Sequence, residues 1–268
     1  MSRTEAQTTE EQSKEPFMPD HSIELVSSPK WLRVFFGGEV IADSRRVILL
    51  RERGQLPVYY VPQEDVRMDL LLASDLKPYR PPKGVASHWS VQVGERIAEN
   101  AAWSYLDPEP AYADLRGIIA FDWHAMDAWF EEDEEVFVHA RDPYKRIDVI
   151  HSSRHLRVVV AGETVAETSR PVLLFETGLP TRYYIPKIDV RMDLLVPSET
   201  HTGCAYKGAA SYYSVQVGDT LVENIAWYYP FPNPEVGKIQ NLVCFFNERV
   251  DALYVDGELM PKPKTPWS

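Results

Sequence analysis

Tyr59-Tyr60-Val61-Pro62 and the following Asp65-Val66-Arg67-Met68-Asp69-Leu70-Leu71 decide how this chain is organised, because the pattern occurs a second time. Adding 124 to each number gives Tyr183-Tyr184, Pro186 and Asp189 to Leu195, and the match continues without a gap to Trp103 and Trp227. This period is far above the roughly 20–50 residues of solenoid repeats, so each copy is large enough to hold its own core. The sequence therefore predicts two domains.

The composition of the 268 residues is that of a globular protein, with 44% hydrophobic and 25% charged residues. No apolar run approaches the roughly 18 residues of a membrane span, and Met1-Ser2-Arg3-Thr4-Glu5 lacks the apolar core of a signal peptide. We therefore expect a cytoplasmic protein with no membrane partner. A net charge of -12 argues against a nucleic-acid partner, although a locally basic pocket for one small anion is compatible with it.

Both cysteines, Cys204 and Cys244, lie in the second copy, and the first copy has Arg80 and Ala120 in their places. A disulfide or a cysteine-based zinc site common to both domains is therefore excluded. The seven histidines show no close metal-ligand spacing. We expect no metal and no cofactor.

Alternating and glycine-bounded segments predict strands throughout. Leu32–Phe36 and Glu39–Ala42 form a hairpin around Gly37-Gly38, where Gly38 and its counterpart Gly162 fit a backbone that needs a positive φ. Asp65 to Leu71 alternates between polar and apolar residues, which favours a half-buried strand over a helical turn after Pro62. With seven or eight strands per copy and almost no helix, the expected fold class is all-β with minor α, a sandwich or barrel-like domain. Further strands are expected at 46–50, 58–61, 86–93, 96–105, 117–123, 126–132, 156–160, 163–166, 241–246 and 250–255, a short helix near 112–116, and irregular segments at 73–82 and 197–206.

The flanking composition sets the expected boundaries. The first residues are polar and thinly supplied with apolar side chains, which predicts a flexible arm, and the run Pro-Lys-Pro-Lys-Thr-Pro predicts an extended tail. The expected division is an arm at 1–27, a first domain at 28–135, a linker at 136–151, a second domain at 152–260 and a tail at 261–268.

Apolar residues that match between the copies are explained by packing in the core, but packing does not explain the charged and amide residues that also match. One explanation is an ion-pair network that fixes strand order, for example Arg67 with Glu99. The other is a pocket with a cation, an amide and aromatic walls, suited to a small, partly anionic ring compound. The candidate ligand-binding residues are Arg67, Asp69, Lys83, Glu99, Asn100 and Trp103, with Arg191, Asp193, Lys207, Glu223, Asn224 and Trp227 in the second copy.

Cys204 is the candidate catalytic residue. It lies three residues before Lys207, and a nearby cation favours the thiolate; an unreactive thiol in a loop is the alternative. Cys244, between Val243 and Phe245, is expected in the core. The acidic run Glu131 to Glu135 occurs only in the first copy and is expected to be a solvated strand end, with a cation-binding or partner-binding surface as the alternative.

Four motifs together resemble the bacterial and fungal family known as domain of unknown function 427, also called nucleotidyltransferase-like. They are Arg33-Val34-Phe35-Phe36-Gly37-Gly38, Tyr59-Tyr60 with Pro62 and Asp65 to Asp69, Lys83-Gly84-Val85-Ala86-Ser87-His88-Trp89-Ser90-Val91, and Glu99-Asn100-Ala101-Ala102-Trp103-Ser104-Tyr105. The resemblance covers about residues 28 to 135 and 152 to 259.

The resemblance implies a β-rich domain similar to the β-tent folds of methionine sulfoxide reductase type B and the drug-binding domain of cereblon, and it implies no established activity. The chain lacks the Cys-x-x-Cys pairs through which many β-tent relatives bind zinc. The family pattern Cys-Pro-Tyr-Lys-Gly is kept as Cys204-Ala205-Tyr206-Lys207-Gly208, whereas the first copy has Arg80-Pro81-Pro82-Lys83-Gly84. Thiol chemistry is therefore expected only in the second domain.

These observations lead to one main hypothesis and two alternatives. The main hypothesis is that each domain binds a small anionic or heterocyclic, nucleotide-like molecule, with Lys83 and Lys207 meeting the anion and the tryptophans forming a wall. The second is an enzyme that uses Cys204 as a nucleophile or redox residue. The third is a protein-interaction scaffold that acts through its acidic surface. The oligomeric state is left open.

Overall fold

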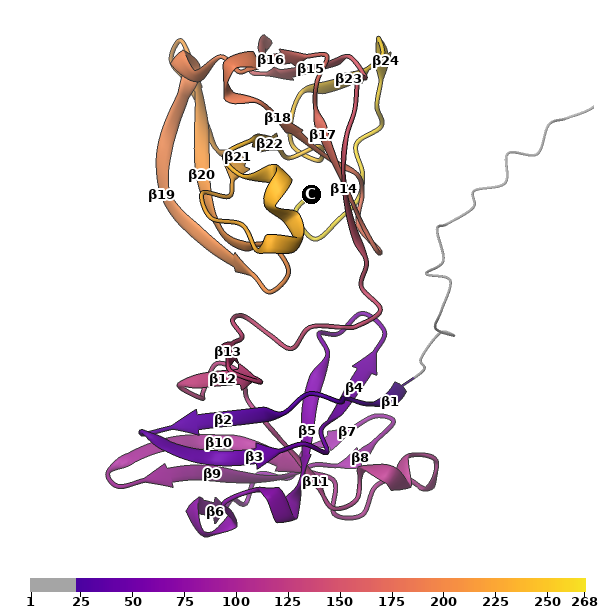
Figure 1. The fold of residues 1–268 in the computed structure, drawn as a ribbon, viewed down its shortest axis with the longest axis vertical. Coiled ribbons are helices and arrows are strands. Elements are labelled where there is room, and N and C mark those ends of the chain that lie inside the picture. Colours follow the sequence, from indigo (N-terminus) through magenta and orange to yellow (C-terminus); the bar gives the residue numbers. More distant parts are fainter. Residues whose placement is uncertain (1–22) are drawn as a thin grey trace, which may run out of the picture.

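The structure is a computed structural model that describes residues 23–268, and these residues form two β-rich domains, one for each copy of the repeat (Figure 1). The first domain occupies the lower half of Figure 1 and the second the upper half, and residues 136–146 pass between them. Within the described residues, no helix combines the length and the apolar character needed to cross a membrane.

Each domain is built on a seven-stranded antiparallel sheet, and the strand order is the same in both copies. The central strands are buried along their whole length, as at Ile118–Phe121, Arg182–Ile185 and Val243–Phe245, because both faces of the sheet are covered there. In order across the first sheet the strands are β1 (Ile23–Ser27), β4 (Ile48–Glu52), β5 (Val58–Pro62), β11 (Ile118–Phe121), β10 (Arg96–Ser104), β9 (Ser87–Val93) and β6 (Leu71–Ala73). The second sheet has β14 (Ile147–His151), β17 (Val172–Glu176), β18 (Arg182–Ile185), β22 (Val243–Phe245), β21 (Thr220–Tyr228), β20 (Gly208–Val217) and β19 (Leu195–Cys204).

A four-stranded antiparallel sheet accompanies each large one. In the first domain it packs Val34, which is fully buried, into the same core cluster as Val91 of the large sheet, and Val158 and Val215 do the same in the second. The strands are β13 (Glu134–Glu135), β12 (Ala128–Glu131), β2 (Leu32–Phe36) and β3 (Glu39–Ser44), then β16 (Glu163–Thr168), β15 (Leu156–Val160), β23 (Ala252–Val255) and β24 (Glu258–Leu259), with a separate pair β7 (Tyr79–Arg80) and β8 (Gly84–Val85).

The all-β class is therefore confirmed, but the domains are not closed barrels. Among the described strands, β1 and β6 are the two edges of the first large sheet, and β14 and β19 are the edges of the second. The hairpin glycines behave as predicted, with φ of 84° at Gly38 and 77° at Gly162. The only helices in the described residues are short 3₁₀ turns: η1 (Gln63–Asp65), η2 (Met68–Leu70), η3 (Pro110–Leu115), η4 (Lys187–Asp189), η5 (Met192–Leu194) and η6 (Pro234–Ile239).

The prediction of a strand over Asp65–Leu71 is wrong, because η1 and η2 lie there instead. After Pro62 the chain makes two successive 3₁₀ turns, in which the amides of Val66 and Leu70 bond to carbonyls three residues back. Val66 forms only an isolated bridge with Ala42. Val66 and Leu71 are buried and Met68 and Leu70 pack against the core, so two consecutive turns produce an alternation that resembles a strand.

The irregular segment predicted at 73–82 and 197–206 exists only in the first copy. There Pro78, Pro81 and Pro82 interrupt the sheet, because proline has no amide hydrogen to donate. The second copy has Thr202, Ala205 and Tyr206 at those positions, and β19 continues to residue 204. The second large sheet therefore has a ten-residue edge strand where the first has three residues.

Both predicted connections are shorter than expected. Residues 23–27, placed in the arm, form β1 and pair with β4, and residues 147–151, placed in the linker, form the equivalent strand β14 and pair with β17. Each strand has three apolar side chains of five, but it is short and follows a polar segment, so the sequence pattern did not separate it from that segment. Residues 1–22 of the predicted arm lie outside the described residues.

The acidic run is only partly a solvated strand end. Asp133 is almost fully exposed, but the carboxylate of Glu131 is mostly buried, contacts the ammonium of Lys30 and accepts a 2.5 Å hydrogen bond from the hydroxyl of Tyr59.

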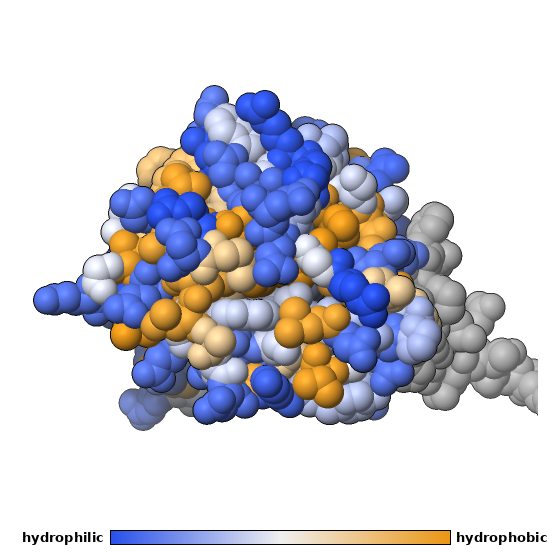
Figure 2. All heavy atoms as spheres, turned by 90° about the horizontal axis from the view of Figure 1, so that it is seen from below, coloured by the Kyte–Doolittle hydropathy of each residue, from blue (hydrophilic) through white to orange (hydrophobic). Residues whose placement is uncertain are grey.

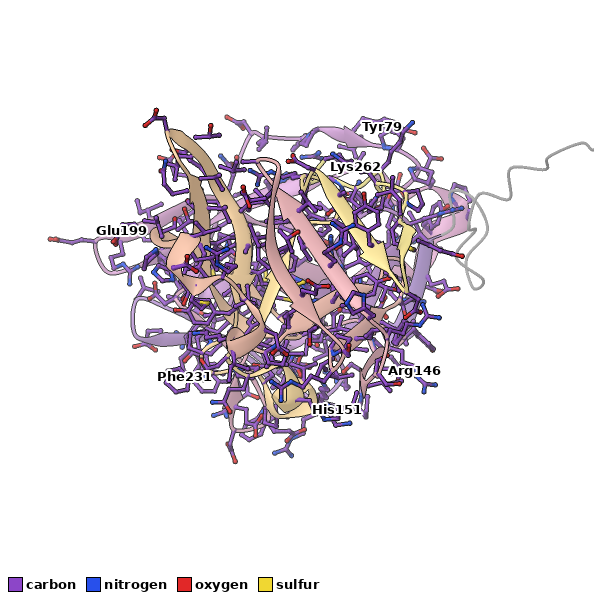
Figure 3. All side chains as sticks on the ribbon, turned by 90° about the horizontal axis from the view of Figure 1, so that it is seen from above. Tyr79, Arg146, His151, Glu199, Phe231 and Lys262 are labelled. Carbon is purple, nitrogen blue, oxygen red and sulfur yellow. The ribbon has the colours of Figure 1, made fainter. Side chains whose placement is uncertain are left out.

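Seen from below, the first-domain end carries separate hydrophobic groups between hydrophilic side chains (Figure 2). Seen from above, Glu199 and Phe231 of the second domain project outward (Figure 3).

Candidate functional site

A lysine–glutamate ion pair occupies the same place in both copies. Lys83 and Lys207 each follow a tight turn, and their ammonium groups reach the carboxylates at the ends of β4 and β17. The first pair joins Lys83 Nζ to Glu52 Oε2 at 2.5 Å, and the second joins Lys207 to Glu176. The two lysines predicted to meet an anion are thus mostly buried and partnered by a carboxylate.

The second pair has an additional cation. Lys145, from the segment between the domains, places Nζ 3.7 Å from the other carboxylate oxygen of Glu176. Two ammonium groups therefore share one carboxylate, which leaves an excess positive charge at this point. The first copy has His21 at the position equivalent to Lys145, and that residue lies outside the described residues.

A tryptophan–tyrosine hydrogen bond accompanies each ion pair. The indole nitrogen of Trp103 donates to the hydroxyl of Tyr60 at 3.0 Å, and Trp227 donates to Tyr184 at 3.3 Å. The two rings meet edge to face in both domains. Burial raises the pKa of the Tyr184 hydroxyl well above its ordinary value, so this phenol stays neutral and serves as a fixed acceptor.

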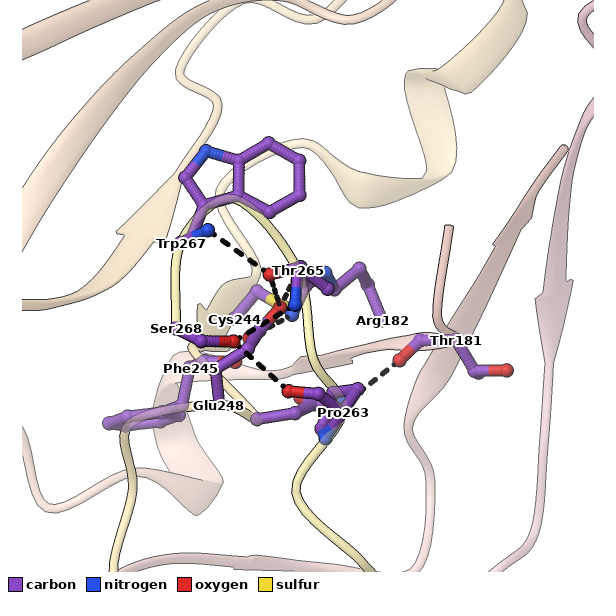
Figure 4. A network of polar contacts seen from close by, with 10 residues as sticks. Thr181, Arg182, Cys244, Phe245, Glu248, Pro263, Thr265, Trp267 and Ser268 are labelled. Carbon is purple, nitrogen blue, oxygen red and sulfur yellow. Dashed lines mark hydrogen bonds and ion pairs between the residues drawn. The ribbon is translucent and has the colours of Figure 1, made fainter. Parts of the chain in front are cut away.

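The second domain adds a buried ion pair that the first domain lacks. Arg182 donates two hydrogen bonds of 2.7 Å to the carboxylate of Glu248, and both side chains are almost fully buried (Figure 4). Burial would raise the pKa of Glu248, but the hydrogen bonds from Arg182 and Thr265 outweigh it and lower that pKa. The corresponding residues of the first copy are Val58 and His124.

Aromatic rings surround this pair. Phe246 lies 4.5 Å from Trp227 between ring centroids and is stacked with Tyr212 at 6.5 Å, and the guanidinium carbon of Arg182 lies 5.5 Å from the Trp227 ring. His88 and Asp122 replace Tyr212 and Phe246 in the first copy. The apolar wall expected in both domains is therefore extensive only in the second.

The residues after the second domain fold back onto this site. Thr265 donates from its hydroxyl to Glu248 at 2.7 Å, and the ring of Trp267 lies 5.5 Å from the Arg182 guanidinium (Figure 4). The backbone amide of Thr265 bonds to the Ser268 hydroxyl at 2.9 Å, which closes a turn. The tail predicted to be extended over 261–268 therefore ends in a turn that contacts the second domain.

A cavity of about 760 Å³ brings these groups together at the junction of the domains. Its walls include Lys207, Glu176, Trp227 and Phe246, the β4–β5 loop of the first domain, and Trp267 of the tail. Five basic and three acidic side chains line it, a net of +2 in a chain of net charge -12. The basic residues are Arg51, Arg53, Lys145, Arg182 and Lys207, and the acidic ones are Glu52, Asp142 and Glu176.

Four predicted ligand residues lie away from this cavity. Arg67 forms a two-bond ion pair with Asp69, at 2.7 and 2.8 Å, and Arg191 with Asp193, at 2.6 and 2.9 Å. All four side chains are at least half exposed. The expected pairing of Arg67 with Glu99 does not occur, because Arg67 lies in the turn beside Asp69 and Glu39.

Asn100 and Asn224, with the preceding Glu99 and Glu223, form a bulge in the β9–β10 and β20–β21 hairpins. The φ values of Asn100 and Asn224 are 54° and 49°. The backbone amide of each donates a hydrogen bond to the hydroxyl of a matched serine, Ser90 or Ser214. Asparagine tolerates this left-handed conformation better than most residues, which explains its retention without a ligand. Neither asparagine nor the exposed glutamates line the cavity.

The two cysteines differ as the sequence suggested. Cys244 is fully buried, and burial raises the pKa of its thiol to about 12. Cys204 is half-buried at the end of β19 rather than in a loop, and it lines the cavity, where its carbonyl accepts the amide of Lys207 at 3.3 Å. Residues 23–268 hold no group of three or more potential metal ligands.

Sequence reasoning missed much of the site. Glu52 and Glu176 could have been found, because they are a charged pair matched at 124 residues. Arg182, Tyr212, Phe246 and Glu248 could not, since they differ between the copies and, unlike the thiol of Cys204, their residue types do not by themselves indicate a site. Of the predicted residues, Lys207, Trp227 and Cys204 line the cavity, while Lys83 and Trp103 form the equivalent contacts in the first domain.

Comparison with known families agrees with the repeat. A family model described as "Domain of unknown function (DUF427)", with the short name NTP_transf_9, matches residues 24–132 and again residues 148–256. The two segments are offset by the period found in the sequence, and their first residues fall within β1 and β14. No curated protein matches the chain.

Proposed function

Because the chain belongs to the family described as domain of unknown function 427, which it contains in two copies, we propose that it binds a small anionic or heterocyclic molecule, nucleotide-like in character. The binding site is the cavity of about 760 Å³ at the second domain. Its volume is within the roughly 300–1,000 Å³ that is usual for small-molecule sites.

The observation that carries this proposal is the combination of aromatic walls and net positive charge in one cavity. A flat ring would pack against Trp227 and Phe246, two mostly buried aromatic residues that line the cavity. An anionic group would lie near Lys145 and Lys207, whose two charges are offset by the single carboxylate of Glu176. A phosphate or carboxylate on a ring meets both requirements.

The first domain supports this site instead of duplicating it. His88 and Asp122 stand where the second domain has Tyr212 and Phe246, which removes the apolar wall. Its contribution is Glu52 and the β4–β5 loop, which border the cavity. We therefore propose one principal pocket in the protein, where the sequence had predicted one pocket in each domain. We also propose that the protein is cytoplasmic.

A thermal-shift comparison of adenosine monophosphate, adenosine and inorganic phosphate tests the proposal. We expect the nucleotide to raise the melting temperature in proportion to ln(1 + [L]/Kd), and adenosine or phosphate alone to raise it less. Tyr212→His, which installs the first-copy residue, should reduce the shift, whereas the matched His88→Tyr change should leave it unchanged. A nucleotide shift that is identical in Tyr212→His would contradict binding at this site.

Cys204 supports a second candidate function, because its half-buried thiol lines the same cavity. In this case the thiolate would attack a bound electrophile, with Lys207 nearby as a cation. Cys204→Ser should then abolish turnover of any substrate found by the ligand screen and leave its binding intact. Undiminished turnover in Cys204→Ser would show that Cys204 is not the nucleophile.

A further inference from the structure

A second cavity, of about 660 Å³, also lies where the two domains meet. The first domain contributes Val26, Leu49 and Tyr59 to its walls, and the second contributes Ile147 and Val236. The segment between the domains supplies Arg141, Asp142, Pro143, Tyr144 and Lys145. Most of this lining is aliphatic or aromatic, so a bound molecule would need an apolar body.

Arg141 is the polar group in this cavity whose bonding is incomplete. Its Nη1 lies 3.6 Å from Glu235 Oε1, which is longer than a hydrogen bond, and its buried Nε atom has no hydrogen-bond partner among residues 23–268. Arg182, by comparison, makes two bonds of 2.7 Å. A guanidinium presents five donors, so Arg141 retains capacity for a ligand acceptor. With about a third of its side chain exposed, it is accessible from the cavity.

The other charges around the cavity are already engaged. Lys30 pairs with Glu131, and Lys145 lies 3.7 Å from Glu176. The carboxylate of Asp142 accepts hydrogen bonds from Arg51 at 3.0 Å and from the amide of Tyr144 at 2.9 Å. Arg141 also has a carboxylate within ion-pair distance, Glu235 at 3.6 Å, but it is the cation of this lining whose Nε has no hydrogen-bond partner among residues 23–268. This free donor favours a ligand with a single negative charge.

From these contacts we propose that the second cavity binds an organic monocarboxylate with an aromatic or branched apolar body, whose carboxylate meets the fork of Arg141. A planar carboxylate matches the guanidinium with two parallel hydrogen bonds. A phosphate dianion would bring a second charge, and the other cations of the described lining, Lys30 and Lys145, each already have a carboxylate within ion-pair distance. Because both domains line the cavity, the ligand would contact both at once.

Titration calorimetry with benzoate as the probe tests this site, with benzamide as the uncharged match. We expect benzoate to bind, benzamide to bind at least tenfold more weakly, and inorganic phosphate not to compete. Arg141→Gln should weaken benzoate binding about tenfold or more, since the charge and its hydrogen bonds to the carboxylate are lost. The benzoate affinity of Arg141→Lys should lie between those of the wild type and Arg141→Gln, because lysine keeps the positive charge but cannot donate the two parallel hydrogen bonds of a guanidinium.

One variant gives a gain that misfolding cannot produce. Glu235 is two-thirds exposed, and Glu235→Gln removes the carboxylate that lies near Arg141, so benzoate should bind more tightly. Arg116→Gln, at an exposed arginine paired with Asp107, is the control and should leave binding unchanged. The double change Arg182→Val with Glu248→His alters the first cavity alone and should also have no effect.

Three results would overturn the proposal. They are benzoate binding that is equal in the wild type and in Arg141→Gln, equal affinity for benzamide and benzoate, and loss of benzoate binding in the Arg182→Val, Glu248→His protein with no loss in Arg141→Gln. The last result would place benzoate in the first cavity, so failure here is distinguishable from failure of the nucleotide proposal.

Discussion

The ammonium of Lys207 lies against the carboxylate of Glu176 at the wall of the larger cavity, and Lys83 and Glu52 repeat this contact 124 residues earlier. The repetition shows that the lysine and the glutamate were retained as a pair. An anion that approaches Lys207 therefore meets a charge already compensated by Glu176, and the excess positive charge there comes from Lys145. The ion pair is a structural element of both domains: both members of the second pair line the larger cavity, whereas the first pair contributes only Glu52.

The two ion pairs should differ in how much their loss destabilises the protein. In the second pair both side chains are almost buried, with 12% of Lys207 and 5% of Glu176 exposed, whereas Glu52 in the first pair is 27% exposed. Lys207→Met should lower the free energy of unfolding by up to about 3–5 kcal/mol, the usual cost of breaking a buried ion pair, because the buried carboxylate of Glu176 then keeps only the more distant Lys145, at 3.7 Å. Lys83→Met should lower the free energy of unfolding by less, since water reaches the carboxylate of Glu52. Urea unfolding of each full-length variant measures the difference.

The exposed Lys262→Met is the control for this comparison and should leave the urea midpoint unchanged. Adding Glu176→Leu to Lys207→Met should recover most of the loss, because both charges are then absent. Equal and small effects of Lys83→Met and Lys207→Met would show that burial does not govern these pairs.

The hairpin asparagines should tolerate glycine better than alanine. At φ of 54° and 49°, alanine at Asn100 or Asn224 should cost about 1–2 kcal/mol relative to glycine, because its Cβ approaches the backbone carbonyl. Asn224→Gly should be nearly neutral, since the side-chain oxygen of Asn224 is buried without a hydrogen-bond partner in the described residues. Asn100→Gly should cost more, because that oxygen accepts a bond from Ser74. Denaturant midpoints of the four variants would settle the order, and equal costs for alanine and glycine would contradict a conformational role.

The sequence predicted the repeat, the hairpins and the all-β class because each depends on local pattern. It failed at Asp65–Leu71, where two 3₁₀ turns produce the alternation of a strand and the backbone amide of Arg67 donates a hydrogen bond to the carbonyl of Ile41. It also failed at β1 and β14, whose pairing with β4 and β17 is not encoded in their own composition. Long-range pairing overrode local pattern in both cases.

Only part of the candidate site could be predicted, because the sequence argument relied on comparing the two copies. Comparing the copies selects residues that both domains need, so it found Lys207 and Trp227 together with Asn224 and Arg191, which serve turns and bulges. It could not find Arg182 and Phe246, because they are specific to the second copy. Cys204 was found as an asymmetry, and it does line the cavity.

His139 should make stability depend on pH between the two domains. Burial lowers the pKa of its imidazole, and the nearby Lys145 and Arg141 act in the same direction, while the bond to the Ala140 carbonyl and the charge of Glu176 oppose them. The unfolded chain therefore binds a proton more readily, since an unperturbed histidine titrates near about 6.5. The contribution is complete above that pH and is lost as the pH falls towards the lowered, folded pKa.

Replacing His139 by Gln should therefore flatten part of this pH dependence. Urea unfolding at pH 7.5, 6.5 and 5.5 measures it, and the difference between the wild type and His139→Gln isolates this residue from the other six histidines. The wild type should lose more stability than the variant on acidification. An identical loss in both proteins would show that His139 is equally easy to protonate in the folded and unfolded states.

Residues 263–268 should limit access to the larger cavity. Trp267 lines its mouth while 45% of the residue remains exposed, and Thr265 fixes the turn by its 2.7 Å bond to Glu248. Cys204 on the cavity wall can report access through its reaction with 5,5′-dithiobis(2-nitrobenzoate), because Cys244 is fully buried and should not react. Removing residues 263–268 should speed this reaction several-fold, and Thr265→Ala should speed it less, since the ring of Trp267 can still return to Arg182. Cys204→Ser should abolish the fast phase, and circular dichroism should show an unchanged fold in each variant. A labelling rate that is the same with and without residues 263–268 would mean that the tail contacts the site without covering it.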